Sequence, residues 1–185
     1  MAKDRNADPR RLDVYAFAST AGALAGEWPQ RDFTRLTDSL MPTPGDTLPP
    51  PVAWSAAGEA RPVSGAAPEC WLRLEAHSTV TLQCQRCLQP MAEAVAIDRD
   101  FRFVHDEDEA ARLDEESEDD VLVASRSFDL RELVEDELIL ALPLVPRHAS
   151  CPQPLPMSAA DEEVDDEAPN PFAALAALRR PPGGR

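Results

Sequence analysis

The segment from residue 128 to residue 146, FDLRELVEDELILALPLVP, constrains this chain most, because it specifies a helix together with its start and its end. Asp129 can cap the helix, and Glu132 follows three residues later, as in a capping box. Pro143 ends the helix, because the residue before a proline is pushed out of helical geometry. The pattern therefore predicts a long helix over residues 130–142.

One face of this predicted helix is apolar, as expected for a helix that packs on a core. Its members are Leu130, Leu133, Val134, Leu138 and Ala141. Glu137 falls inside this apolar stripe. If Glu137 is buried, it needs an arginine or backbone donors, since an unpaired charge in a core is costly. A carboxylate that reaches water at the rim is the alternative.

Two acidic runs carry almost all of the net charge of -16. Residues 106–120 hold ten acids and one base, and residues 161–167 hold six acids. Nineteen prolines and an aromatic content of only 5% also indicate disordered segments. We expect a disordered N-terminus over residues 1–10, an acidic loop over 106–120 and an acidic linker over 152–168.

The sequence indicates a soluble protein of the cytoplasm. It has no window of 18 consecutive apolar residues, and its first residues, MAKDR, lack the apolar core of a secretory signal. Four cysteines in a chain of 185 residues do not make a disulfide framework, so we expect reduced thiols.

Apolar residues alternate with polar ones in several segments between positions 52 and 124, which is typical of strands. Short connections between successive strands favour an antiparallel sheet with one face packed on the predicted helix. The sequence therefore predicts an α+β fold in a single domain over residues 11–151. The predicted strands cover residues 52–56, 70–76, 79–84 and 91–104, with a possible edge strand at 121–124.

Beyond the acidic linker, Asn170 and Pro171 resemble a helix start, a cap followed by a proline at the first helical position. They predict a short helix over residues 169–180. Docking of this helix on its own domain is the favoured interpretation, and a partner-binding peptide is the alternative. Its apolar side carries Phe172, Leu175 and Leu178.

Two pairs of potential metal ligands stand far apart in the sequence. Cys84 and Cys87 lie at the turn between two predicted strands, and His148 and Cys151 follow the predicted helix. Two such pairs can assemble a tetrahedral zinc site, so we predict that these four residues bind one zinc ion. The alternative is that Cys84 and Cys87 are plain half-buried thiols at the end of a hairpin. The sequence favours this alternative slightly over a metal site.

Other catalytic motifs are absent from the sequence. There is no glycine-rich phosphate loop and no G-x-S-x-G motif, and the three histidines have no recognisable catalytic spacing. We therefore expect a protein that is not an enzyme and has no small-molecule substrate.

Three strings occur in order at residues 79–90, 129–146 and 169–178, namely TVTLQCQRCLQP, DLRELVEDELILALPLVP and PNPFAALAAL. Their sequence, order and spacing resemble the YceD family, the large ribosomal RNA subunit accumulation proteins. The resemblance implies a cytoplasmic bacterial protein needed for the synthesis, processing or stability of 23S ribosomal RNA. It carries no assigned catalytic residue.

The main hypothesis is therefore a non-enzymatic ribosome-biogenesis factor. Its expected partner is a ribosomal protein or an assembly factor, with 23S ribosomal RNA or its precursor contacted directly or indirectly, and no membrane. The expected partner-binding residues are Phe172, Leu175, Leu178 and Arg86. Of these, Arg86 would be exposed at the turn of Cys84 and Cys87. The alternatives are a zinc- or thiol-dependent enzyme acting on RNA or protein, and a purely structural interaction module.

Overall fold

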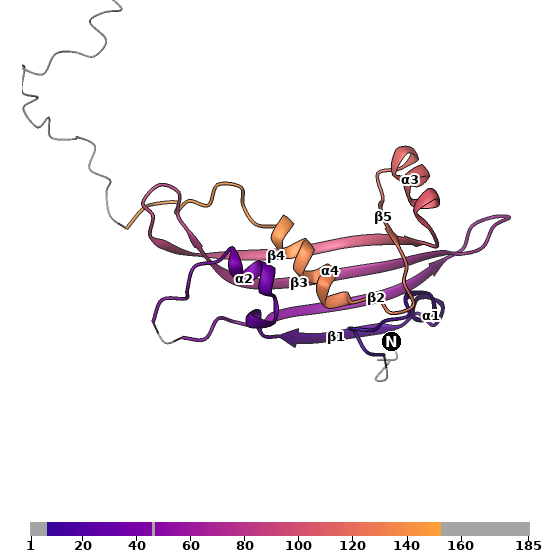
Figure 1. Ribbon diagram of the computed structural model, residues 1–185, viewed down its shortest axis with the longest axis horizontal. Helices are drawn as coiled ribbons and strands as arrows, with labels where there is room; N and C mark the ends of the chain where they lie inside the picture. Colours follow the sequence, from indigo (N-terminus) through magenta and orange to yellow (C-terminus); the bar gives the residue numbers. More distant parts are fainter. Residues whose placement is uncertain (1–6, 46, 153–185) are drawn as a thin grey trace, which may run out of the picture. The chain divides into compact units, whose positions relative to one another are not determined.

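A five-stranded sheet forms the frame of the protein (Figure 1). The computed structural model describes residues 7–152, apart from residue 46. The strands lie in sequence order across the sheet, and the first four pair antiparallel with their neighbours. The α+β class is thus confirmed. The strands are β1 (Ala23–Trp28), β2 (Val52–Arg61), β3 (Glu69–Gln83), β4 (Pro90–Val104) and β5 (Asp120–Val123).

The strand β3 is longer than the sequence pattern predicted, whereas β4 agrees with the predicted strand over 91–104 to within one residue. The segments 70–76 and 79–84, predicted as separate strands, belong to one strand of 15 residues, β3. Alternation continues across the gap, because Ser78 is buried and accepts a hydrogen bond of 2.9 Å from the Gln30 side chain. A polar residue on the core face therefore does not interrupt the strand.

The fifth strand makes the sheet mixed, so the prediction of an antiparallel sheet was wrong at this edge. β5 pairs with β4 in the parallel sense. A parallel neighbour needs a crossover connection, which is usually a helix. The helix α3 (Glu107–Glu116) supplies that crossover, and it occupies most of the predicted acidic loop over 106–120.

Local interactions explain why the acidic run is helical. The Asp106 side chain caps α3 by accepting a hydrogen bond of 2.8 Å from the backbone N–H of Glu109. The first turn holds three acids, which interact favourably with the positive end of the helix dipole. Arg112 also pairs with Glu116 one turn later, at 2.8 Å.

The helix α4 (Leu130–Leu140) begins as predicted but has only 11 residues, so the prediction of a long helix to residue 142 was wrong. Asp129 accepts hydrogen bonds from the backbone N–H groups of Arg131 and Glu132, at 2.9 and 3.3 Å. At the other end the last turn tightens, because the N–H of Leu142 donates to the carbonyl of Ile139. The helix therefore ends at Leu140, before Pro143.

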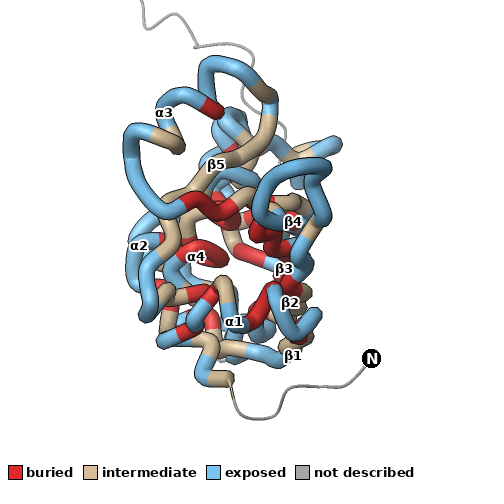
Figure 2. Tube along the Cα trace, turned by 90° about the vertical axis from the view of Figure 1, so that its right-hand side faces the viewer, coloured by how far each residue is buried: buried red, intermediate tan, exposed pale blue. Residues whose placement is uncertain are grey.

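The core lies between one face of the sheet and the helices, where Figure 2 shows the buried residues. α4 packs on β3 and β4, and α1 (Val14–Ser19) packs on β2 and β3. The short helices η1 (Gln30–Asp32) and α2 (Thr34–Asp38) complete the layer, with α2 against α4. On β3 the core-facing side chains alternate with exposed ones, and they are Cys70, Leu72, Leu74, Ala76, Ser78, Val80 and Leu82.

Residues 7–10, which belong to the segment predicted to be disordered, contact the start of α4. The carbonyl of Pro9 accepts a hydrogen bond of 2.9 Å from the N–H of Leu130. Arg10 pairs with Asp129 at 3.5 Å, so both contacts tie this segment to the start of α4. Residues 1–6, most of the predicted linker and the predicted helix over 169–180 lie outside the described residues.

Candidate metal centre

A tight turn at the end of the β3–β4 hairpin presents two thiols. The N–H of Cys84 donates to the carbonyl of Gln89 at 3.0 Å, and the N–H of Leu88 donates to the carbonyl of Cys84 at 2.8 Å. Leu88 adopts a φ of 59°, in the left-handed region. This turn reverses the chain within six residues and places the side chains of Cys84 and Cys87 close together.

The second half of the centre comes from the irregular segment after α4. Its Pro146 carbonyl accepts a hydrogen bond of 2.8 Å from the N–H of Gln85. The N–H of His148 lies 3.4 Å from the Cys84 sulfur, to which it donates. These two bonds hold the segment against the hairpin turn.

All four residues predicted as ligands meet at this point. One ligand atom from each of Cys84, Cys87, His148 and Cys151 lies within 4.8 Å of every other. Cys87 Sγ and His148 Nδ1 are 3.4 Å apart. Tetrahedral zinc with metal–ligand distances of about 2.0 to 2.3 Å places its ligand atoms about 3.3 to 3.8 Å apart. The cluster thus needs only small side-chain movements to surround such an ion.

The electrostatics of the cluster favour a thiolate at Cys84. Burial raises the pKa of this thiol, but backbone hydrogen bonds outweigh burial and lower that pKa to about 5. The donors are the backbone N–H groups of Cys87, His148 and Arg86. Thiolate is the form that binds metal ions. The hydrogen bonds of the turn thus favour the metal-binding form of Cys84 even without a metal ion.

Cys151 behaves in the opposite way. Burial raises its pKa above the ordinary value, and the neighbouring sulfurs of Cys87 and Cys84 raise it further. Several thiolates cannot share so small a space without a compensating positive charge. A divalent cation would supply that charge, and binding it would release protons from the remaining thiols.

The fourth cysteine does not belong to the centre. Cys70 is buried in the core, where its thiol donates to the carbonyl of Val14 at 3.7 Å. Burial and the charge of Asp13 raise its pKa to about 11, so it stays protonated. It therefore behaves as a small apolar core residue.

Most arginines on the strands are engaged in ion pairs. Arg73 pairs with Asp98 and Glu75, and Arg102 pairs with Glu69 at 2.8 Å. Arg86, by contrast, is exposed at the metal-centre turn, and among the described residues it makes no ion pair. The other predicted partner-binding residues, Phe172, Leu175 and Leu178, lie outside the part of the chain that the structure describes.

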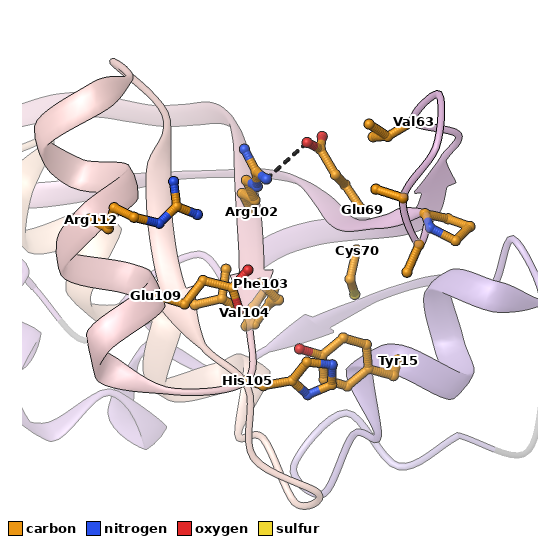
Figure 3. A pocket seen from close by; sticks show the side chains of 13 residues that line it. Tyr15, Val63, Glu69, Cys70, Arg102, Phe103, Val104, His105, Glu109 and Arg112 are labelled. Atoms are coloured by element: carbon orange, nitrogen blue, oxygen red, sulfur yellow. Dashed lines mark ion pairs between the residues drawn. The ribbon is translucent and has the colours of Figure 1, made fainter.

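A separate cavity of about 340 Å³ lies between α1, α3, β4 and the β2–β3 loop with the start of β3 (Figure 3). The ring of Tyr15 stacks on His105 with 4.4 Å between centroids, and burial raises the pKa of Tyr15 to about 12. Within residues 7–152, its buried hydroxyl has no hydrogen-bond partner. No motif in the sequence indicates this cavity, because its lining comes from separate elements without a shared spacing. Charges of both signs, such as Arg112 and Glu109, line it and define no single ligand chemistry.

The fold and the cluster together define a small α+β domain with a Cys3His centre of the kind that holds structural metal ions. The family model described as "Large ribosomal RNA subunit accumulation protein YceD" matches residues 72–179. The chain belongs to this family. The matched residues include α4 and all four residues of the cluster.

A similar protein is the large ribosomal RNA subunit accumulation protein YceD of Haemophilus influenzae, which is 39% identical over 106 residues. The aligned region covers 55% of this chain and 60% of that relative. No solved structure matches the chain. Among the residues that the structure describes, no helix is both long and apolar enough to cross a membrane.

Proposed function

We propose that this protein is a bacterial, cytoplasmic factor required for the accumulation of 23S ribosomal RNA, through its synthesis, processing or stability. Family membership and the printed name of the Haemophilus relative support this role. We further propose that the protein acts by binding, without catalysis. The convergence of four ligand atoms within 4.8 Å supports this second step, because four protein ligands complete a tetrahedral zinc site and leave no position for a substrate.

The proposed metal is zinc. Three sulfur ligands and one imidazole are the ligand types of structural zinc sites, and a tetrahedral arrangement of them favours zinc over harder cations. The ion would bind Cys84, Cys87, His148 and Cys151. Its role would be to fasten the segment after α4 to the end of the β3–β4 hairpin, where only a few hydrogen bonds now hold it.

The proposed partner is a protein, either a ribosomal protein or an assembly factor. Contacts with RNA phosphates need clustered arginine and lysine side chains, whereas this chain carries a net charge of -16. The strand arginines Arg73 and Arg102 are already paired with acids. Contact with 23S ribosomal RNA or its precursor would therefore be secondary, and no membrane or small-molecule substrate is proposed. Arg86 and the predicted C-terminal helix would contribute to partner binding.

Two measurements test the proposal. Native mass spectrometry of the purified chain should find one zinc ion, which the Cys87→Ser variant should lose and the Cys70→Ser variant should retain. Because Cys70 is a buried thiol outside the cluster, it controls for the loss of any thiol. In cells, deletion of the gene should lower mature 23S ribosomal RNA and large ribosomal subunits. Unchanged levels of both would refute the biological role, independently of the metal.

A thiol-dependent enzyme is the second candidate, favoured by one observation. A pKa of about 5 keeps Cys84 ionised near neutral pH, as a nucleophilic thiolate would be. This hypothesis requires that replacing Cys84 and Cys87 by serine abolishes function while the fold and its thermal stability remain. Loss of function together with unfolding of the hairpin turn and of the segment after α4 would favour the binding protein instead.

A further inference from the structure

Charge is distributed unevenly along the long axis of the sheet. The β3–β4 turn and the segment after α4 lie at the end of the sheet opposite α3 (Figure 1). Residues 76–92 and 138–152, which hold the hairpin turn and the segment after α4, contain no Asp or Glu, whereas residues 106–120 hold ten. Arg86 and Arg147 are exposed here. In a chain of net charge -16, these two segments are therefore locally cationic. The neighbouring residues 30–41, which contact Thr79 and Thr81, hold two arginines and two acids and add no net charge.

The same end exposes most of the large apolar side chains that the described residues leave in solvent. Six such side chains are exposed in the described residues, and four of them lie on the hairpin turn or between residues 140 and 145. The hydrogen bond between Gln85 and Pro146 holds their two segments together. We define the metal-end surface as these four residues with the two arginines, namely Leu88, Leu140, Leu144, Val145, Arg86 and Arg147.

Leaving large apolar side chains in water is unfavourable. Leu144 is fully exposed, at 100%, and its neighbour Val145 is exposed at 51%. Grouped apolar side chains rimmed by polar ones mark sites of protein interaction. The rim here is formed by two arginines, so an acidic partner would be attracted and a basic one repelled.

We propose that the metal-end surface binds an acidic, apolar segment of a partner protein. Aliphatic side chains of that segment would pack on Leu88, Leu144 and Val145, and its carboxylates would pair with Arg86 and Arg147. RNA fits this surface less well, because single-stranded bases are held by stacking on aromatic rings. The turn and the segment after α4 offer aliphatic side chains, with no Phe, Tyr or Trp between residues 84 and 89 or 140 and 151.

The metal centre would shape this surface. Arg86 lies between the two cysteines of the turn, and Arg147 directly precedes His148. Metal binding by the four residues would fix the backbone on both sides of the metal-end surface. Less conformational entropy would then be lost when the partner binds. The inference rests on the proposed function in taking a protein as the partner, but it does not require that the partner act on ribosomal RNA.

A photo-crosslinking experiment in cells tests it with the full chain. Leu144 is replaced by p-benzoylphenylalanine, and the peptide that crosslinks after irradiation is identified by mass spectrometry. The matched control places p-benzoylphenylalanine at Val63 instead. Val63 is also exposed, but it lies in the β2–β3 loop at the opposite end of the β-sheet. The expected adduct at Leu144 contains a peptide of another protein with Asp or Glu among apolar residues. The variant with the crosslinker at Val63 should not form this adduct.

Charge reversal decides whether the adduct is specific. The double variant Arg86→Glu with Arg147→Glu should lose the crosslink while it retains its circular dichroism spectrum and its bound metal. Reversing the acids of the identified peptide to lysine should then restore the crosslink. An adduct on RNA, on the same chain or on a basic peptide overturns the inference, as does a yield no higher than at Val63. A deletion strain with normal 23S ribosomal RNA would overturn only the proposed function.

Discussion

Arg99 of β4 donates a hydrogen bond of 2.8 Å from Nη1 to Oε2 of Glu137 on α4. Glu137 is buried, with its side chain 8% exposed, so the acid in the apolar stripe of the helix is paired and does not reach water at the rim. Glu135, two residues earlier on α4, is also buried and accepts hydrogen bonds from the backbone N–H and the guanidinium of Arg35. Two buried carboxylates thus connect α4 to β4 and to α2.

Replacing Glu137 by alanine should lower the free energy of unfolding by about 2 kcal/mol, because Arg99 would lose its buried partner while staying partly hydrated. For a chain of this size that corresponds to a fall in Tm of about 4 to 8 °C. Glu116→Ala, which breaks the exposed pair with Arg112, should change stability by less than about 0.5 kcal/mol. Equal effects of the two substitutions in urea denaturation would contradict the structural role of the buried pair.

Removal of the proposed zinc ion should loosen the hairpin turn and the segment after α4 more than the rest of the sheet. Treatment of the purified chain with a chelator should lower Tm and increase hydrogen exchange at residues 84–89 and 141–151. The reason is that the ion would hold the two segments together, and binding to the folded state alone stabilises it. In Cys87→Ser the chelator should have no further effect. A chelator that leaves Tm and exchange unchanged in the parent chain would exclude a structural metal.

The metal-free chain should become less stable as the pH falls. Folding lowers the pKa of Cys84 from the ordinary thiol value of 9.0 to about 5. A group with a lowered pKa in the folded state stabilises fully above its unfolded pKa, and this contribution is lost as the pH falls toward 5. Cys151 has a raised pKa and contributes in the opposite sense at alkaline pH.

Urea denaturation of the chelated protein between pH 5 and pH 9 measures this dependence. The slope of the free energy of unfolding against pH should become flatter in Cys84→Ser, which has no thiol at that position. An identical slope in the parent and the variant would contradict the depressed pKa of Cys84.

Gly58 of β2 lies close against α1. A Cβ atom added there would lie 2.7 Å from the Phe17 ring and 2.8 Å from the Cα of Ala18. The Ala18 backbone cannot move away cheaply, so Gly58→Ala should destabilise the fold by about 1 to 3 kcal/mol. The exposed Gly45 has no atom within 4 Å of an added Cβ but adopts a φ of 76°, so its alanine variant reports backbone strain alone. Thermal unfolding of both variants separates crowding from strain.

Much of the fold could be predicted because its determinants are local. The cap at Asp129 and the stop near Pro143 specify α4 within a few residues, and alternation with period two specifies β4 and the two halves of β3. The four ligand residues could be selected for the same reason, since each pair is separated by only two residues. Short-range spacing is fixed by the geometry of turns, strands and helices.

Only the tertiary structure decided features that join distant segments. Sequence periodicity could not show that the acidic run crosses over as α3 and makes β5 parallel, or that Arg99 is the partner of Glu137. The meeting of Cys87 with His148, 61 residues apart, depends on the sheet register and on the hydrogen bond from Gln85 to Pro146. Local propensity limits each segment to a few conformations, whereas the burial of shared apolar surface selects which segments meet.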